Sequence, residues 1–579
     1  MIRPFRFWMM SVFTLATFLL LVTRLGYVQI YCHAALYERA EREHAKNRGP
    51  LDPPRGQILD RDGRVLAMSI GGGSCFADPA CVENRDEAAR QLAPLLNLPL
   101  PLLKEKLSEH RRFVWLGRRL DPEAVQSVQE LNLSGIHVIP ELKRFYPEES
   151  LAAHVLGVVG ENQKGLSGVE QTVDGWLRGR AVPNFFKEWT SVKHEAPRLA
   201  VKRDPSTRSV VLTLDRTLQY IAEQELVVQM GLSRPKSGTV IIEDPSTGEI
   251  LAMATAPSFN PNVWGTNRAE ESYGPEILKN FAVERVIEPG STFKLITAAA
   301  AIEERSVHLT DGFFCENGLW EIQGRTIHDH EKEGWLTFTE VISHSSNIGT
   351  AKIALRLGQD NLYRYARAFG FGLPTGCGLP GDGSGILRPP AQWRTGSLMT
   401  VAFGQEVGVT PLQMVNAYAV IANGGWLMEP RLYKGLIDQD GAYREWAQNK
   451  PIRRVVSSRT VAIMRRILKD VVDHGTGKAA AVDGISVGGK TGTAQKIDPL
   501  THQYSADRYV ASFCGFAPVE SPRIVIGVFL DEPRTSSYWG GSEAAPLFSR
   551  IVHDVAPYLQ FKPQSSIGPV AVLKTLPRS

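Results

Sequence analysis

Cysteine is scarce in this chain, and its spacing excludes one common kind of site. Six cysteines stand among 579 residues, at positions 32, 75, 81, 315, 377 and 514. No C-x-x-C pair occurs, so a zinc ribbon is unsupported. Cys75 and Cys81 lie close enough in sequence to bond in an oxidising compartment, but we expect free thiols there.

An excess of charge of one sign is missing as well. Lys and Arg number 65 and Asp and Glu number 61, so the formal net charge is +4. This near balance gives no basis for nucleic-acid binding. The hydrophobic content of 43% is typical of a globular protein. The chain is too long for one hydrophobic core, so two or three domains are expected.

A long apolar run is present at the N-terminus. Residues 7–22 are all apolar or small, and residues 25–30 extend the run past Arg24. Twenty-four helical residues span about 36 Å, enough to cross a bilayer with some tilt. Arg3 and Arg6 precede the run, which predicts a cytoplasmic N-terminus. No A-x-A cleavage site follows closely, so we expect an uncleaved signal anchor with the rest of the chain outside the membrane.

Three short motifs follow one another in the remainder of the chain. They are Ser291-Thr292-Phe293-Lys294, Ser345-Ser346-Asn347 and Lys490-Thr491-Gly492-Thr493. Each alone is commonplace: a helix start with a solvated lysine, a cluster of helix-capping residues, or a glycine-rich turn. Their order, spacing and context together predict an active-site serine enzyme that acts on acyl-D-Ala-D-Ala peptides.

The first motif carries the nucleophile and its base. Pro289-Gly290 followed by an alanine-rich run predicts a helix that begins at Ser291. Lys294 lies three residues on, on the same helix face, where it can take the hydroxyl proton. A lysine serves as a base only if burial or a nearby cation lowers its pKa, and we expect Lys490 to be that cation.

The other two motifs supply groups for the substrate. Ser345 is expected to relay a proton between Lys294 and the leaving amine, and Asn347 to hydrogen-bond the substrate backbone. Lys490, Thr491 and Thr493 are expected on a strand, facing the terminal carboxylate, with Gly492 allowing the substrate backbone to approach. The backbone N–H groups of Ser291 and Thr493 would form the oxyanion hole.

With these motifs and several longer stretches, the chain resembles a class B penicillin-binding protein, a monofunctional peptidoglycan D,D-transpeptidase. The phrase EPGSTFK at 288–294 is highly specific to that family, and RGQILDRDG at 55–63, GLSGVE at 165–170 and DPSTGEILAM at 244–253 also match. The overall length resembles the division (septal) type more than the elongation type. At the rim of the cleft, Glu406 stands where the family tends to have a small residue.

The resemblance implies the substrates, partners and organisation of the protein. Stem peptides of the glycan built from lipid-linked precursors are the implied substrates, and β-lactams the inhibitors; no cofactor or metal is required. No glycosyltransferase domain fits in the chain, so a polytopic membrane glycosyltransferase and other division proteins are the implied partners. The expected segments are a cytoplasmic N-terminus (1–6), a transmembrane anchor (7–30), a stalk and non-catalytic pedestal, or dimerisation-type, domain (31–205), a transpeptidase domain (206–560) and a disordered tail (561–579).

Residue patterns predict an α+β fold in which an antiparallel sheet carries helices. Residues 213–230 read as a helix, 237–253 as a hairpin, and 509–516 and 524–530 as a further strand pair. Residues 87–107 and 122–133 read as helices of the pedestal. His328-Asp329-His330 suggests a metal site, but no third ligand is predictable, and we expect a solvated turn or hairpin.

Four other functions stay open at this stage. An elongation-type transpeptidase would share every motif. A β-lactamase would need a water-activating carboxylate and no pedestal, and rapid release of bound penicillin would reveal it. A β-lactam sensor normally has several membrane helices, and a catalytically silent division scaffold would fail in a transpeptidation assay.

Overall fold

The computed structural model describes residues 3–26, 54–109, 111–160, 163–178, 207–264, 274–322, 324–438, 440–446, 451–498, 501, 503–535 and 538–561. The chain divides into two compact units. One comprises Met1–Pro54 and Ile70–Lys143, and the other comprises Arg55–Ser69 and Arg144–Ser579. The chain crosses from one unit to the other within β2 (Val65–Ala77) and again within β4 (Ile136–Phe145).

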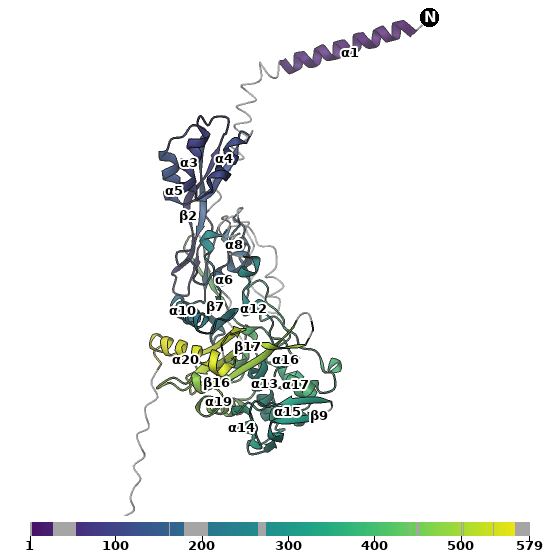
Figure 1. Ribbon diagram of the computed structural model, residues 1–579, viewed down its shortest axis with the longest axis vertical. Coiled ribbons are helices and arrows are strands. Elements are labelled where there is room, and N and C mark those ends of the chain that lie inside the picture. Colours follow the sequence, from purple (N-terminus) through teal and green to yellow (C-terminus); the bar gives the residue numbers. More distant parts are fainter. Residues whose placement is uncertain are drawn as a thin grey trace, which may run out of the picture. The chain divides into compact units, whose positions relative to one another are not determined.

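The first unit begins with helix α1 (Arg3–Gly26), which covers most of the expected anchor (Figure 1). None of the described helices reaches the combination of length and apolarity that a membrane span requires. Residues 27–30 of the expected anchor and the stalk before residue 54 lie outside the described residues.

The rest of the first unit is a small α/β body with its own core. Helices α3 (Arg85–Leu96), α4 (Leu100–Ser108) and α5 (Pro122–Glu130) accompany strand β3 (Val114–Leu120). The single helix predicted for 87–107 is wrong. Asn97 adopts the left-handed conformation (φ 52°) and caps α3, and Pro99 precedes a new helix start.

The second unit is built on a five-stranded antiparallel sheet in the order β16-β17-β18-β6-β7. The strands are β6 (Ser237–Asp244), β7 (Glu249–Ala256), β16 (Gly488–Ile497), β17 (Tyr504–Ala517) and β18 (Ile524–Asp531). Both predicted strand pairs, and the α+β class with an antiparallel sheet, are confirmed. Strand β16, which carries the third motif, lies at one end of the sheet, so only one of its edges is paired with another strand.

Helices cover both faces of this sheet because successive residues of its strands are buried, and successive side chains point to opposite faces. Val240 and Ile242 of β6 belong to a core with α10 (Arg216–Ser233) and α20 (Gly540–Tyr558). Ile241, on the opposite face, belongs to the larger core. That core includes the helices that carry the first two motifs, α13 (Lys294–Glu303) and α15 (Asn347–Leu357), together with α18 (Pro411–Ala422) and α19 (Ser458–Asp473).

Part of the predicted pedestal belongs to the second unit. Arg55 and Arg144 both bind the fully buried carboxylate of Glu170, each through Nε at 2.6 Å. Removing the Glu170 carboxylate would leave the buried guanidinium of Arg144 without its ionic partner, and loss of such a partner typically costs about 3–5 kcal/mol. The expected segment 31–205 is therefore shared between the two units. The tail expected to be disordered lies, after residue 561, outside the described residues.

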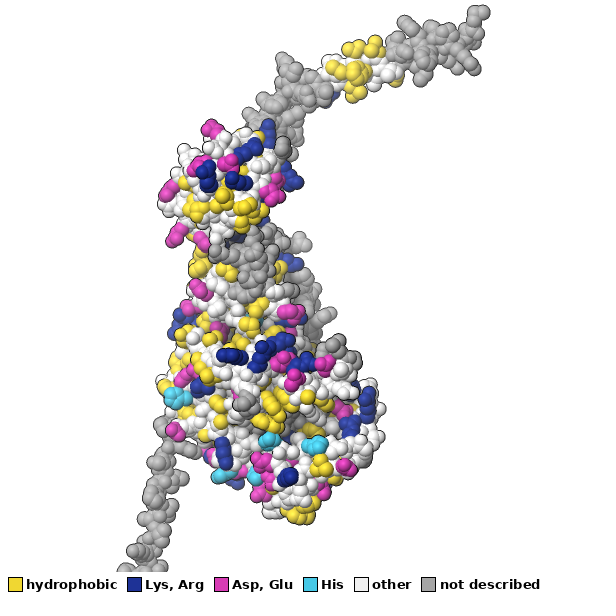
Figure 2. Space-filling model, in the orientation of Figure 1, with side chains coloured by type: hydrophobic (Ala, Val, Ile, Leu, Met, Phe, Trp, Pro, Cys, Tyr) yellow, Lys and Arg dark blue, Asp and Glu magenta, His cyan; other side chains and the backbone are white. Residues whose placement is uncertain are grey.

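Acidic and basic side chains are interspersed over the face of the second unit shown in Figure 2, as the near-balanced charge leads one to expect. The cysteines at 75, 81, 315, 377 and 514 are free thiols.

Candidate active site

Ser291 lies in a short 3-10 turn, Gly290–Phe293, that leads directly into α13. Two glycines shape this turn. Gly290 has φ +55° and donates its N–H to the carbonyl of Gly404 at 3.1 Å. Gly404 has φ +87°, and a Cβ there would lie 2.1 Å from the Gly290 oxygen. The serine therefore stands at a helix start, as predicted, but close contact with a distant loop fixes the turn.

Lys294 is the first residue of α13 and is fully buried. Its ammonium nitrogen donates to the backbone oxygen of Ser345 and, at 3.2 Å, to Ser345 Oγ. Burial lowers the pKa of Lys294 to about 7, while Asp329 and Cys315 act in the opposite direction. No hydrogen bond joins Lys294 to Ser291 Oγ in the described structure; such contacts are often long in enzymes without substrate.

Lys490 is also fully buried. Burial and the charge of Lys294 hold the pKa of Lys490 well below its ordinary value. Repulsion between two ammonium groups is mutual, and the influence of Lys490 on Lys294 stays a prediction. Burial is the largest cause of the lowered Lys294 pKa.

The second motif occupies a tight turn between α14 (Phe338–Ser343) and α15. Ser345 adopts a left-handed backbone (φ +64°), which is uncommon for a residue other than glycine. Ser346 caps α15, accepting from the N–H of Gly349 at 2.9 Å. Asn347 donates its side-chain amide to the carbonyl of His328 at 2.8 Å. Helix capping thus falls to Ser346, which leaves the Ser345 hydroxyl to Lys294.

Asp329 holds this turn in place, and sequence reasoning missed it. Its carboxylate accepts from the N–H groups of Asn347 (2.5 Å) and Ile348 (3.0 Å) and from Ser346 Oγ (2.5 Å). The expected hairpin exists, as β9 (Leu319–Ile322) and β10 (Arg325–His328), but Asp329 after it is not a solvated turn residue. A carboxylate is favoured at the positive end of a helix, and this one lies near enough to Lys294 to raise its pKa.

The third motif lies on β16, as expected. Lys490 donates to the Thr491 hydroxyl at 3.2 Å and to the Thr476 hydroxyl at 3.3 Å. The Thr493 hydroxyl accepts from the N–H of Gly540, at the start of α20, at 3.0 Å. Thr491 and Thr493 both line the cleft.

Gly492 also allows close packing within the protein. A Cβ at Gly492 would lie 2.4 Å from Ser512 Oγ, 2.9 Å from the Thr292 side chain and 3.0 Å from the Pro289 carbonyl. Its missing side chain lets β16 pack against the turn that bears Ser291. The glycine thus brings two motifs together, and its expected role toward the substrate backbone stays a prediction.

The three motifs converge on a cleft of about 450 Å³. Ser291, Ser345, Asn347, Thr491 and Thr493 line it, whereas Lys294, Lys490 and Gly492 lie behind its wall. The ring of Trp539 packs on His330 at the rim, with centroids 4.1 Å apart. These two residues lie far apart in sequence, and neither belongs to the three motifs. A nucleophilic hydroxyl, a buried amine and a strand edge together suit acyl transfer from a peptide.

Comparisons with known proteins agree with this chemistry. Residues 238–553 match the model of the penicillin-binding protein transpeptidase domain, and residues 50–184 that of the penicillin-binding protein dimerisation domain. Stage V sporulation protein D of Bacillus subtilis is 35% identical over 96% of this chain and 86% of its own length. Peptidoglycan D,D-transpeptidase FtsI of Escherichia coli is 30% identical over 88% and 84%. The crystal structure of penicillin-binding protein 3 from Mycobacterium tuberculosis in complex with aztreonam superposes with a TM-score of 0.68 at 30% identity, covering 89% of this chain and 98% of that one.

Proposed function

The chain belongs to the class B penicillin-binding proteins and is a serine D,D-transpeptidase of peptidoglycan, and we propose that Ser291 is the residue it acylates. The observation that carries this proposal is the burial of Lys294, whose amine is held by Ser345 behind a cleft that both serines line. A base with a pKa near 7 is well matched to proton transfer at physiological pH.

The proposed reaction has two steps. Ser291 Oγ attacks the carbonyl of the penultimate D-Ala, and its proton passes to the neutral amine of Lys294. The bond to the terminal D-Ala breaks, and the leaving nitrogen takes that proton through Ser345. An amine of a second stem peptide then attacks the ester and loses its proton to Lys294. The Ser291 oxygen is released from the acyl group and takes a proton again.

The remaining motif residues bind charge in this scheme. The backbone N–H groups of Ser291 and Thr493 stabilise the oxyanion that forms in each step. Thr491 and Thr493 face the terminal carboxylate of the donor, and Lys490 lies behind them, bound to the Thr491 hydroxyl. Asn347 hydrogen-bonds the donor backbone, and the backbone of Gly492 lies beside it.

Labelling with a fluorescent penicillin tests the nucleophile. We expect a single stable adduct on the peptide that contains Ser291, located by mass spectrometry. Ser291→Ala should abolish the adduct, because Ser345, the other serine that lines the cleft, is held as a hydrogen-bond acceptor by Lys294 and is assigned the proton relay. Labelling of Ser345, or labelling that survives in Ser291→Ala, would contradict the assignment.

The cellular setting is a second part of the proposal. We propose that the apolar run, residues 7–30, anchors the protein by a single pass in the cytoplasmic membrane, with the catalytic unit in the periplasm. Arg24 within this apolar helix favours contact with a polytopic glycosyltransferase, because an anchor alone does not need a charge. Similarity to FtsI supports a septal role alongside other division proteins.

A fluorescent fusion distinguishes the septal from the elongation role. We expect a fusion to the cytoplasmic N-terminus to concentrate at mid-cell in dividing cells. The matched control replaces residues 1–31 by an unrelated single-pass anchor of the same orientation, and it should lose both mid-cell enrichment and co-purification with the membrane glycan polymerase. Fluorescence spread along the side wall would favour an elongation enzyme, and an anchor exchange without effect would leave α1 as a tether only.

A further inference from the structure

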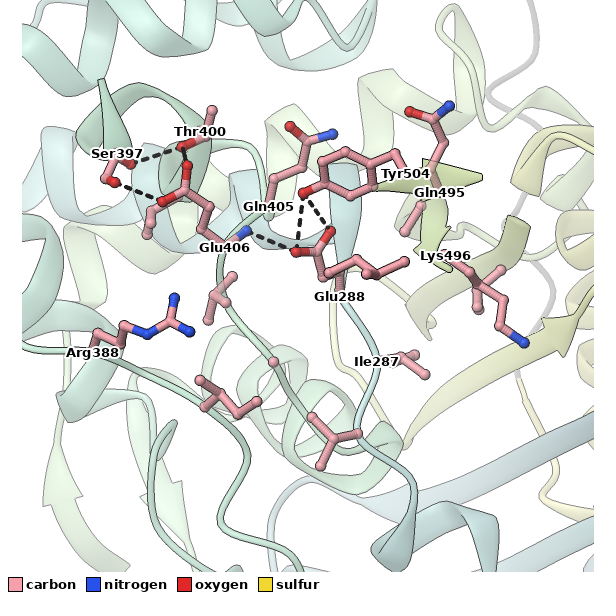
Figure 3. Close-up of a pocket in the computed structure, with 18 of the residues that line it drawn as sticks. Ile287, Glu288, Arg388, Ser397, Thr400, Gln405, Glu406, Gln495, Lys496 and Tyr504 are labelled. Carbon is pink, nitrogen blue, oxygen red and sulfur yellow. Dashed lines mark hydrogen bonds between the residues drawn. The ribbon is translucent and has the colours of Figure 1, made fainter. Parts of the chain in front are cut away.

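A second and larger cavity, of about 1080 Å³, adjoins the catalytic cleft. Its walls come from three segments: Arg285–Glu288, which leads to the Ser291 turn; residues 386–408; and the end of β16 with Tyr504 (Figure 3). Gln405 and Ala494 line both this cavity and the cleft, so the two spaces adjoin along β16. The reaction proposed above uses none of the charged groups in this cavity.

Glu288 is an acid in this cavity without a cationic partner. It accepts from the N–H of Glu406 at 2.9 Å and from the Tyr504 hydroxyl at 3.1 Å (Figure 3). Within the described parts of the chain, no lysine or arginine forms an ion pair with it. Burial raises the pKa of Glu288 to about 7. The neighbouring carboxylate of Glu406, in contrast, is satisfied by Arg325 at 2.7 Å and by two hydroxyls.

Two arginines of the same cavity are also available to a ligand. Arg388 and Arg394 are exposed, and neither forms an ion pair with any residue that the structure describes. The guanidinium of Arg388 points into the cavity (Figure 3). Arg285 and Lys496 differ, because Arg285 pairs with Asp531 and Lys496 pairs with both Asp531 and Glu532. The cavity therefore offers an unpaired acid and two unpaired guanidinium groups.

The direction of the donor peptide along β16 follows from the roles proposed for that strand. The terminal carboxylate lies at Lys490 and Thr491, and the reacting carbonyl, one residue earlier in the donor, lies at Thr493. The donor therefore runs antiparallel to β16, and its preceding residues extend toward Ala494–Ile497. At about 3.4 Å per residue, these four positions cover about 14 Å of donor upstream of the reacting bond. That stretch of β16 forms a wall of the large cavity.

We propose that this cavity binds the part of the donor stem peptide that precedes D-Ala-D-Ala, with Glu288 contacting its side-chain amine and Arg388 and Arg394 pairing with its carboxylates. This inference rests on the proposed function. Donor and acceptor are the same kind of stem peptide. Each donor therefore carries the side-chain amine with which a stem peptide can also act as an acceptor. Hydrogen bonds to charged partners are the stronger class, and arginine is well suited to binding a carboxylate. The cavity thereby selects stem peptides over other peptides that end in D-Ala-D-Ala.

The test compares donors that differ by one group. The detergent-solubilised full-length protein is given a synthetic pentapeptide donor with a free side-chain amine, the same donor with that amine acetylated, and the same donor with its upstream carboxylate amidated. Lysine and diaminopimelate versions are both used as probes. The kcat/KM of D-Ala release is measured for the parent, Glu288→Gln, Arg388→Ala and Arg394→Ala. Arg459→Ala, an exposed arginine on α19 outside the cavity, is the matched control.

We expect Glu288→Gln to lower kcat/KM about tenfold for the free-amine donor and to leave the acetylated donor unchanged. Arg388→Ala and Arg394→Ala should each lower kcat/KM about tenfold for the carboxylate donor and not for its amide. Arg459→Ala should match the parent. Equal losses on all donors, or no loss on any, would overturn the inference. The inference would also be overturned if the variants changed only how the rate depends on the concentration of acceptor peptide. That result would assign the cavity to the acceptor peptide.

A penicillin with a small side chain separates this inference from the proposed function. Such a ligand ends within the cleft, so its acylation rate should be the same in all four variants and the parent. A parent that penicillin does not acylate would overturn the proposed function itself. If penicillin acylates the variants normally and their kcat/KM does not depend on the donor's amine or carboxylate, only the role of the cavity is overturned.

Discussion

Lys294→Met should lower the rate of acylation by penicillin about 100- to 10,000-fold, the usual contribution of a general base. This corresponds to about 2.7–5.4 kcal/mol of transition-state stabilisation. Methionine nearly matches the volume of the buried lysine and lacks the amine, so folding is retained and the melting temperature stays close to that of the parent. Stopped-flow acylation with a fluorescent penicillin measures the rate.

The pH dependence of the acylation rate is a second test of Lys294 as the base. In the parent, the rate should rise as the pH rises through about 7, because only the neutral amine of Lys294 accepts the serine proton. The acylation rate of Lys294→Met should not show this rise with pH. Lys352→Met is the matched control, since that lysine binds the Phe314 carbonyl and Glu316 and does not line the cleft. A Lys294→Met protein that acylates at the parental rate would show that another group takes the proton.

Asp329→Ala should lower acylation about 10- to 100-fold, although Asp329 belongs to none of the three motifs. The substitution removes three hydrogen bonds that fix the start of α15 and with it Ser345 and Asn347. A displacement of about 1 Å in catalytic groups can cost as much as 100-fold in rate. Loss of the helix cap should also reduce the free energy of unfolding by about 1–2 kcal/mol. Acylation kinetics and denaturant unfolding measure the two effects.

The conservative variant separates positioning from charge. Asp329→Asn keeps an oxygen for the two N–H groups, so most of the stability and rate should return. It removes a charge that raises the pKa of Lys294, so the rise of acylation with pH should begin at lower pH than in the parent. Asp215→Ala is the matched control, because Asp215 caps α10 through two N–H groups outside the cleft. If Asp329→Ala loses stability and no more acylation rate than Asp215→Ala, Asp329 is only a helix cap.

Local patterns were sufficient to predict the elements that carry the motifs. A Pro-Gly pair before an alanine-rich run predicted the helix start at Ser291, and runs rich in β-forming residues predicted both strand pairs. The failures were local as well. The left-handed Asn97 breaks the helix predicted for 87–107, and β17 begins at Tyr504, five residues before the predicted strand. Hydrophobic periodicity continues across such points, so it does not reveal them.

By itself the sequence determined the nucleophile motif, the spacing of Lys294 and the order of the three motifs, because these signals lie within a few neighbouring residues. Tertiary structure alone decided which groups surround them. Asp329 reaches Ser346 across 17 positions, Gly540 reaches Thr493 across 47, and Tyr504 reaches Glu288 across 216. The lowered pKa of Lys294 arises from burial beneath segments brought together by folding, and so does the unpaired acid of the second cavity. Burial and charge pairing are properties of packed neighbours, and a pattern read along one chain does not contain them.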